Sequence, residues 1–291
     1  MAQAPKLLVI DGYTRAAREQ LTAGGASTAS DLYVQMLAQC GPDGIHCEVL
    51  FPSDEGVSLP DREQLVQYDG VAWTGCSLSV NDAGPQVEGQ IQIVRDCYAA
   101  GIPGFGSCWA AQIAVVAAGG RVGPNPHGRE MGIARKIGLT NPGKEHPLYA
   151  GKQSLFDGFT SHDEHITQLP AGAVALAGNA WTPIQSVAVR HQAGEFWGLQ
   201  YHPEYDLHEL ARLTFCRIEK LVRLGFFGTP EEAHRYVDLL EALHEDPSRK
   251  DIGWQLGIDR DVMDASVRQL EVRNWLNHLV LPTMASRRGG V

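Results

Sequence analysis

The sequence lacks several features that would assign it to large classes of proteins. No apolar run approaches the ~18 residues that a membrane-spanning helix needs, and the first residues do not show the charged and then apolar profile of a secretion signal. Basic residues are also few, because 24 lysines and arginines stand against 34 acidic residues and give a formal net charge of −10. Nucleic acids and anionic membranes bind basic surfaces, so neither is an expected partner.

Cysteine and histidine are not arranged as a disulfide framework or a metal site. The six cysteines contain no CxxC pair, and a chain of 291 residues can bury a sufficient core without disulfides. His162 and His165 lie three residues apart, but neither HExxH nor a Cys/His cluster with ligand spacing is present. We therefore expect reduced thiols, a cytoplasmic location, no metal and no other cofactor.

Short apolar segments alternate with helical patterns in the first half of the chain. Segments 6–11, 46–51 and 68–73 are typical of buried parallel strands, and helices are expected near 30–40, 87–100 and 110–118. This alternation predicts an α/β fold with a doubly wound, mostly parallel, flavodoxin-like sheet flanked by helices, whose sites lie at the carboxyl ends of the strands. Closely spaced extended segments between 130 and 200 predict an antiparallel extension of that sheet.

Segment 104–112, Gly-Phe-Gly-Ser-Cys-Trp-Ala-Ala-Gln, has the pattern of a nucleophile elbow. An elbow turns sharply from a strand into a helix, so the residues two before and two after the nucleophile must be small, as Gly106 and Ala110 are. Cys108 would then lie at a helix N-terminus, whose partial positive charge favours a thiolate. The alternative is an inert buried cysteine, which is a common environment for this residue type.

The segment His202-Pro203-Glu204, which follows the apolar run 196–200, supplies a base and an acid. Residues two apart in an extended segment point to the same side, so His202 and Glu204 can form a hydrogen bond, and Pro203 keeps His202 extended. A cysteine, an imidazole and a carboxylate that orients the imidazole make up a catalytic triad.

These residues resemble the class I, or triad, glutamine amidotransferases. Segment 106–112 matches G-x-C-x-G-x-Q, with Ala110 in place of a glycine, and segment 202–204 matches H-P-E. Segment 71–77 resembles the strand and glycine loop that donate an oxyanion-hole N–H. Segment 161–166, Ser-His-Asp-Glu-His-Ile, resembles the S-H-G-D-x-V segment of the GMP synthetase glutaminase domain. The four segments also occur in the family's order.

The resemblance implies a reaction through a γ-glutamyl thioester. Cys108 would attack the γ-carboxamide carbon of a small-molecule γ-glutamyl substrate, His202 would carry the proton, and Glu204 would orient His202. The backbone N–H groups of Gly75 and Trp109 would hold the oxyanion. The remaining polar groups of the substrate would be bound by residues of the elbow helix and of the S-H-G-D-like segment: Gln112, Ser161, Asp163 and Glu164.

Alternative functions stay open on this evidence. We favour a hydrolase of N-substituted γ-glutamyl amides such as γ-glutamylanilide, because Asp163 and Glu164 depart from S-H-G-D and no acceptor domain is recognisable in the sequence. The alternative is a glutaminase subunit that passes ammonia to a synthetase partner subunit. A non-catalytic module that binds a glutamyl ligand is disfavoured, because the three triad residues are all present.

A boundary near residue 225 is predicted to divide the chain into an amidotransferase-like domain, 1–225, and a helical extension, 226–291. One amphipathic helix is expected at 208–224, and others at 230–244 and at 261–279, the last ending before Pro282 and followed by a disordered tail, 286–291. The extension fits a cap on its own domain and a homodimer surface or partial lid equally well. Arg129 and Glu130, in a segment that is structural in the family, are assigned no chemistry.

Overall fold

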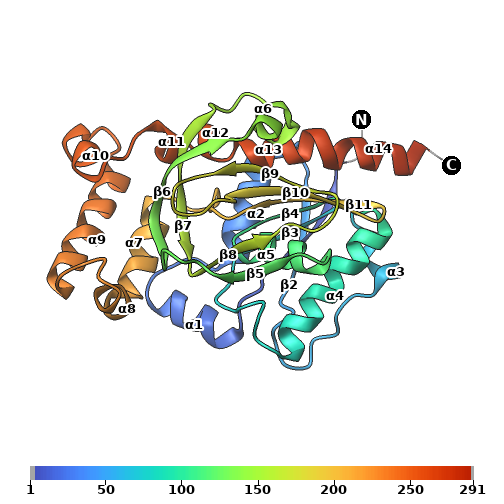
Figure 1. The fold of residues 1–291 in the computed structure, drawn as a ribbon, viewed down its shortest axis with the longest axis horizontal. Coiled ribbons are helices and arrows are strands. Elements are labelled where there is room, and N and C mark those ends of the chain that lie inside the picture. Colours follow the sequence, from blue (N-terminus) through green and yellow to red (C-terminus); the bar gives the residue numbers. More distant parts are fainter. Residues whose placement is uncertain (1–3, 290–291) are drawn as a thin grey trace.

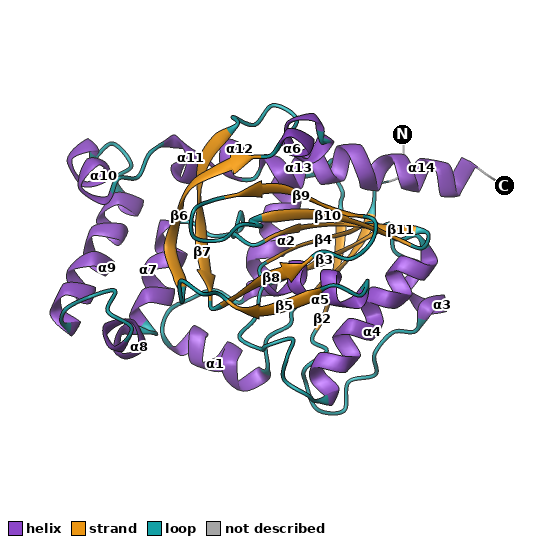
Figure 2. Cartoon of the chain, in the orientation of Figure 1, coloured by secondary structure: helices purple, strands orange, loops and turns teal. Residues whose placement is uncertain are grey.

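The computed structural model describes residues 4–289 and is built around a nine-stranded sheet (Figures 1 and 2). The strand order is β2-β1-β3-β4-β11-β10-β9-β6-β7, parallel from β2 to β11 and antiparallel from β11 to β7. The mostly parallel sheet with an antiparallel extension is thereby confirmed. The strands are β1 Lys6–Ile10, β2 His46–Leu50, β3 Gly70–Trp73, β4 Gly104–Ser107, β6 Glu130–Leu139, β7 Leu155–His162, β9 Ala173–Gly178, β10 Ser186–His191 and β11 Gly194–Leu199.

Helices cover both faces of the sheet. The apolar residues of α4 (Pro85–Ala100) and α5 (Trp109–Ala117) share one core with β3 and β10, and those of α2 (Ala29–Cys40) and α13 (Leu270–Trp275) share the other core with β1 and β11. Shorter elements complete the layers: α1 Arg15–Ala23, α3 Arg62–Leu65, α6 Asn141–Glu145 and a 3₁₀ turn, Pro147–Tyr149. Among residues 4–289, no helix combines the length and the apolar character needed to cross a membrane.

Two elements near the site were not expected from the sequence. Strands β5 (Arg121–Pro124) and β8 (Glu164–Gln168) form a separate antiparallel pair next to α5. Helix α1 begins at the N-cap Thr14, whose side chain accepts a hydrogen bond from the N–H of Ala17. The polar sequence of α1 concealed it, because the nine-residue helix has no buried side chain and Leu21 is its one large apolar residue.

The C-terminal helices pack against the rest of the same chain. Helix α9 lies along α7 at one end of the molecule (Figure 1), and the Trp275 ring of α13 lies 5.4 Å from that of Phe105 in the centre of the sheet. The extension is therefore a cap on its own domain, and its use as a dimer surface stays a prediction. Its elements are α9 Pro230–Glu245, α10 Lys250–Leu256, α11 Arg260–Met263, α12 Ala265–Arg268, α13, a π-helical turn Leu276–Val280 and α14 Leu281–Gly289.

Of the three helices expected at 208–224, 230–244 and 261–279, the second is confirmed as α9 and the other two are interrupted. The helix expected at 208–224 is two helices, α7 (Leu207–Phe215) and α8 (Ile218–Arg223), because the backbone turns at Arg217, where φ is −123° and ψ is 14°. The helix expected at 261–279 is broken at Asp264, an extended residue whose side chain caps α12. The predicted end before Pro282 is also wrong. Pro282 lies in the first turn of α14, a position where a helix tolerates proline.

The prediction of a disordered tail from residue 286 is wrong for 286–289. These residues belong to α14, where Arg287 Nη1 donates to the carbonyl of Tyr68 (3.0 Å) and Arg288 Nη2 to Asp69 Oδ2 (2.8 Å). Asp69 also accepts from the N–H of Lys6 (2.9 Å), so the two ends of the chain meet at this carboxylate. Residues 290 and 291 lie outside the described residues.

Candidate active site

Three adjacent parallel strands carry the predicted catalytic groups to one edge of the sheet. β4 lies between β3 and β11, and the chain leaves these strands at Gly75, Cys108 and His202. The contacts are close, because a Cβ placed on Gly75 would lie 2.9 Å from His202 Cε1 and 3.4 Å from Cys108 Cβ. The sheet thus brings together residues that are far apart in the sequence.

Cys108 has the backbone of a nucleophile elbow. Its φ of 52° and ψ of −105° lie outside the regions that non-glycine residues favour, which costs of order 1–3 kcal/mol. Small neighbours are required, since a Cβ on Gly106 would lie 2.3 Å from that of Ala110 and 2.4 Å from the carbonyl oxygen of Trp73. The strain holds the thiol at the N-terminus of α5, with Sγ 3.8 Å from the carbonyl oxygen of Ser161.

His202 is buried and oriented by Glu204. Its Nδ1 lies 2.7 Å from Glu204 Oε1, which also accepts from Ser107 Oγ (2.8 Å). The ring of Tyr205 stacks on the imidazole with centroids 4.1 Å apart and planes 4° apart. The hydrogen bond to Glu204 uses Nδ1, and the other ring nitrogen, Nε2, makes no hydrogen bond to a described residue. His202 is thus held with Nε2 available for proton transfer.

The charge state of His202 is set by two opposing effects. Burial disfavours the imidazolium, but the negative charges of Glu204 and of a Cys108 thiolate outweigh it and raise the pKa of His202 to about 9. A protonated imidazole beside a cysteine favours the thiolate, which is the nucleophilic form.

The two predicted oxyanion donors flank Cys108. Gly75 follows β3 and borders both Cys108 and His202, while Trp109 is the first residue of α5, where a backbone N–H has no partner within the helix. The indole of Trp109 is held in place by a hydrogen bond from its Nε1 to Gln90 Oε1 (3.0 Å). The same oxygen also accepts from Trp73 Nε1. Both N–H groups are therefore the candidate donors of an oxyanion hole.

A cavity of about 350 Å³ opens over Cys108 and His202, and its wall includes the four residues that the sequence assigned to substrate binding: Gln112, Ser161, Asp163 and Glu164. Gln112 Nε2 donates to the carbonyl of Glu164 (3.0 Å) and to Gln200 Oε1 (3.2 Å). The Glu164 carboxylate accepts from Ser79 Oγ (2.9 Å) and Asn81 Nδ2 (2.8 Å). Both side chains therefore tie the wall of the cavity together.

Cations that the sequence analysis did not assign lie in the same wall. Arg129 pairs with Asp163 and donates to Ser161 Oγ (2.7 Å), and Lys220 lies 3.1 Å from Asp163 Oδ2. Arg217 also donates to Ser161 Oγ (2.8 Å) and has no acidic partner among the described residues. The cavity can therefore bind a carboxylate. No sequence motif marks Arg217, because its position depends on the break between α7 and α8.

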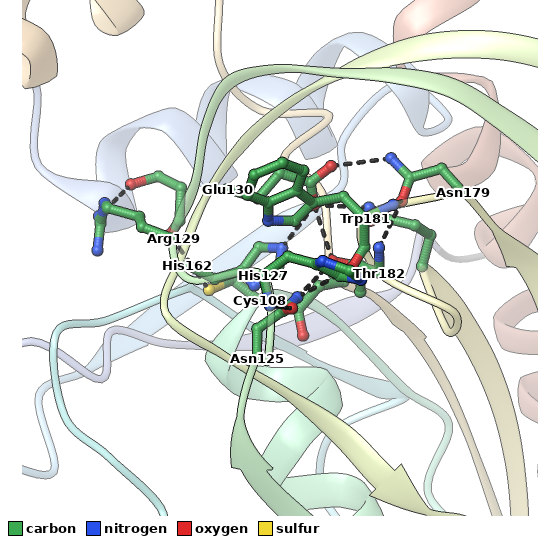
Figure 3. A network of polar contacts seen from close by, with 12 residues as sticks. Cys108, Asn125, His127, Arg129, Glu130, His162, Asn179, Trp181 and Thr182 are labelled. Carbon is green, nitrogen blue, oxygen red and sulfur yellow. Dashed lines mark hydrogen bonds and ion pairs between the residues drawn. The ribbon is translucent and has the colours of Figure 1, made fainter. Parts of the chain in front are cut away.

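Glu130, to which no chemistry was assigned, is the centre of a buried network beside the cavity (Figure 3). Its carboxylate accepts from Asn179 Nδ2 (2.8 Å), Thr182 Oγ1 (3.0 Å) and Gln185 Nε2 (2.8 Å), and it lies 2.9 Å from His162 Nε2. The other nitrogen of His162 faces the carbonyl of Glu164 at 2.8 Å. Both ring nitrogens of His162 thus lie within hydrogen-bond distance of an oxygen atom. The buried contact between Glu130 and His162 fixes the turn between β7 and β8.

Replacing this carboxylate is expected to destabilise the protein. Burial alone would raise the pKa of Glu130, but its donors and the charge of His162 hold it below the ordinary value of 4.5. We expect Glu130→Gln to lower the free energy of unfolding by roughly 3 kcal/mol at neutral pH, because His162 loses its buried partner. A carboxylate with a depressed pKa stabilises above its unfolded pKa, so the deficit should shrink as the pH falls below 4.5.

Urea unfolding at pH 7 and at pH 4 measures both effects. Glu88→Gln, an exposed acid on α4, is the control and should leave stability unchanged. If Glu130→Gln and Glu88→Gln lower the free energy of unfolding equally at pH 7, the stabilising role of the Glu130 carboxylate is contradicted.

Among the described residues, no group of three or more histidine, cysteine or acidic side chains is arranged to hold a metal ion. Cys76 lines the cavity near Cys108, but burial raises the pKa of its thiol well above 9. That environment suits a buried small side chain rather than a second nucleophile.

The fold and site define an α/β protein with a cysteine at a nucleophile elbow, beside a histidine held by a carboxylate. The chain belongs to the class I glutamine amidotransferase family, whose family model matches residues 32–218. Family membership confirms the expectation of an amide-hydrolysing enzyme.

Two kinds of relatives share this sequence pattern. A γ-glutamyl-L-1-hydroxyisopropylamide hydrolase from a Pseudomonas species is 34% identical over 98% of this chain and 96% of its own. A glutamine-hydrolysing GMP synthase from Aeromonas hydrophila is 29% identical over 59% of this chain but only 32% of its own length. The chain thus spans about a third of that GMP synthase.

Solved structures share the fold at lower identity. A glutamine amidotransferase from Thermotoga maritima superimposes with a TM-score of 0.64 at 15% identity, covering 96% of this chain and 99% of its own. One from Methylobacillus flagellatus has a TM-score of 0.59 at 20% identity, covering 97% and 95%. These two extend the fold match through the C-terminal helices.

Proposed function

We propose that this protein is a cysteine-dependent hydrolase of γ-glutamyl amides that releases glutamate and an amine from an N-substituted substrate. The observation that carries the proposal is the meeting of Cys108, at a strained elbow, with His202 in the wall of one cavity, where Glu204 holds the imidazole from behind that wall. The relative named as a γ-glutamyl-L-1-hydroxyisopropylamide hydrolase, which this chain matches over almost its full length, supports the substituted amide as substrate.

In the first half of the reaction, the Cys108 thiolate attacks the γ-carboxamide carbon. The carbonyl oxygen becomes an oxyanion that the N–H groups of Gly75 and Trp109 stabilise, and the loss of one such donor typically costs ~2.7–4 kcal/mol of barrier. His202 Nε2 then gives its proton to the leaving nitrogen, the C–N bond breaks, and the amine departs from a γ-glutamyl thioester.

In the second half, His202 accepts a proton from water, which attacks the thioester carbon. The C–S bond breaks, glutamate leaves, and Cys108 returns as the thiolate beside the protonated His202. Glu204 orients the imidazole throughout and supports its positive charge whenever His202 is protonated.

The polar wall of the cavity would hold the two charged ends of the glutamyl group. The α-carboxylate would meet Arg217, which has no acidic partner among the described residues, and the α-ammonium would meet the carboxylate of Glu164. Gln112 and Ser161 position these groups through the hydrogen bonds described above, and Asp163 places Arg129 and Lys220.

A second candidate is a glutaminase subunit that passes ammonia to a synthetase partner subunit. Glutamine-hydrolysing GMP synthases match 59% of this chain, which favours glutamine as an alternative substrate. A non-catalytic glutamyl-binding module has less support, because strain at Cys108 would serve no purpose without a nucleophile.

The two candidates differ in the substrate that purified protein hydrolyses alone. We expect kcat/KM for at least one N-alkyl or N-aryl amide, such as γ-glutamylisopropylamide or γ-glutamylanilide, to exceed that for glutamine by at least about tenfold, equivalent to ~1.4 kcal/mol of transition-state stabilisation. Glutamate release measures both. If glutamine is the best substrate, or all substrates stay inert until another subunit is added, the glutaminase subunit replaces the amide hydrolase.

A further inference from the structure

A second cavity, of about 650 Å³, adjoins the one over Cys108. It lies between α1 and the corner where α7 meets α8. The two cavities share four wall residues, which are Tyr13, Ser77, Arg217 and Lys220. A molecule bound in the first cavity can therefore extend past these residues into the second, which we call the α1–α8 cavity.

The shared residues lie on the side of the site where the amine departs. Tyr205 stacks on His202, the group that protonates the leaving nitrogen. Tyr205, Tyr13 and Arg217 all line the cavity over Cys108, together with His202. By contrast, Gln112 and the other residues assigned to the glutamyl group, apart from Arg217, line only the first cavity.

The α1–α8 cavity combines an apolar wall with an excess of positive charge. Ala17 and Leu21 of α1 face Phe215, whose side chain is 43% exposed and therefore has surface to bury. Its charged residues are Arg217, Lys220 and Arg223 against a single acid, Glu219. Asp163 neutralises Lys220, but neither Arg217 nor Arg223 has an acidic partner among the described residues.

We propose that the α1–α8 cavity binds the substituent on the leaving nitrogen, and that it selects neutral or anionic alkyl and aryl groups over cationic ones. The proposal rests on the proposed function and adds to it the location and chemical class of the amine subsite. The apolar wall gains from burying hydrocarbon. When Arg217 holds the α-carboxylate, Arg223 is the arginine that would repel a second ammonium group.

Filling the cavity tests its location. Ala17→Phe places a ring in the α1–α8 cavity, and the readout is the ratio of kcat/KM for γ-glutamylisopropylamide to kcat/KM for glutamine, which has no substituent. We expect this ratio to fall at least about tenfold. The matched control is Ala16→Phe, one residue earlier on α1, which lines a different cavity and should leave the ratio unchanged.

A second variant keeps the test independent of how well Ala17→Phe folds. Phe215→Ala removes apolar surface and should lower the same ratio, by about threefold or more, at an unchanged melting temperature. If the ratio is unchanged in both variants, or if kcat/KM falls equally for both substrates, the α1–α8 cavity is not the site of the amine substituent. Failure of the proposed function looks different, because wild-type protein would then not hydrolyse the isopropylamide in preference to glutamine.

Charge selection is tested with two amides of similar size, the neutral propylamide and the cationic 2-aminoethylamide of γ-glutamate. Wild-type protein should prefer the neutral amide by at least about tenfold, and Arg223→Glu should narrow this preference. Added salt should also narrow it, because Arg223 is exposed. A preference that is absent in the wild type, or unchanged in Arg223→Glu, overturns the chemical class assigned to the cavity.

Discussion

Cys108→Ala is expected to lower kcat/KM for every γ-glutamyl substrate by about 10⁴-fold or more. The thiolate is the only proposed nucleophile, and no other cysteine in the cavity wall can replace it, because burial raises the pKa of Cys76 well above 9. The variant should keep its fold, since alanine retains the Cβ and the same strained backbone at the elbow. Steady-state glutamate release and a thermal melt measure the two effects.

Cys47→Ala provides the control, because Cys47 lies on the edge strand β2, away from the site. It should hydrolyse substrates at the wild-type rate. A glutamine analogue with an electrophilic γ carbon gives an independent readout and should label Cys108 alone among the six cysteines. Near wild-type turnover by Cys108→Ala, or labelling at Cys76, would refute the assigned nucleophile.

His202→Asn is expected to be about as severe as Cys108→Ala, and Glu204→Gln roughly a hundredfold milder. Asparagine removes the proton carrier, whereas glutamine in place of Glu204 can still orient the ring while withdrawing the charge that supports the imidazolium. Kinetic constants for both variants measure the difference. Equal and small losses would mean that the His-Pro-Glu segment is only the end of a strand.

The pH dependence separates a catalytic from a structural role of His202. Because the pKa of His202 is about 9, kcat/KM of the wild type should fall as the pH rises through about 9. Glu204→Gln should move this fall to lower pH, since the carboxylate is the main group that raises the pKa. A profile that does not move would contradict the proposed support of the imidazolium by Glu204.

The same pKa predicts the direction of a stability change. The folded pKa lies above the ordinary value of 6.5, so the contribution of His202 to stability is fully present below pH 6.5 and is lost as the pH rises through about 9. The shift corresponds to roughly 3 kcal/mol. The difference in unfolding free energy between wild type and His202→Asn should therefore be larger at pH 6.5 than at pH 9.

The elbow could be predicted from the sequence because its constraints are local. A turn that needs small residues on both sides of the nucleophile leaves a visible pattern, and Gly106 and Ala110 are in fact in contact around Cys108. The pairing of His202 with Glu204 was also predictable, since two residues on one side of an extended segment need no distant partner. The buried strands β1 and β3 were predictable for the same reason, as burial on both faces gives continuous apolar runs.

Other parts of the site depend on contacts between distant segments. Asp163 was expected to bind substrate directly, but it is paired with Arg129 from the start of β6 and with Lys220 from α8. Glu130 gives no sequence signal for its role, because its partners come from two distant segments, the end of β7 and the stretch 179–185. Neither pairing follows from spacing along the chain.

The sequence by itself predicted a candidate nucleophile, a candidate base and the alternation of strands and helices, because each of these leaves a local pattern along the chain. Only the tertiary structure decided that α1 and the corner between α7 and α8 enclose a second cavity, which adjoins the one over Cys108. Arg217 reaches both cavities because the chain turns there instead of continuing as one helix. Such a cavity exists only once separate segments pack, since its shape and charge belong to the gap between them.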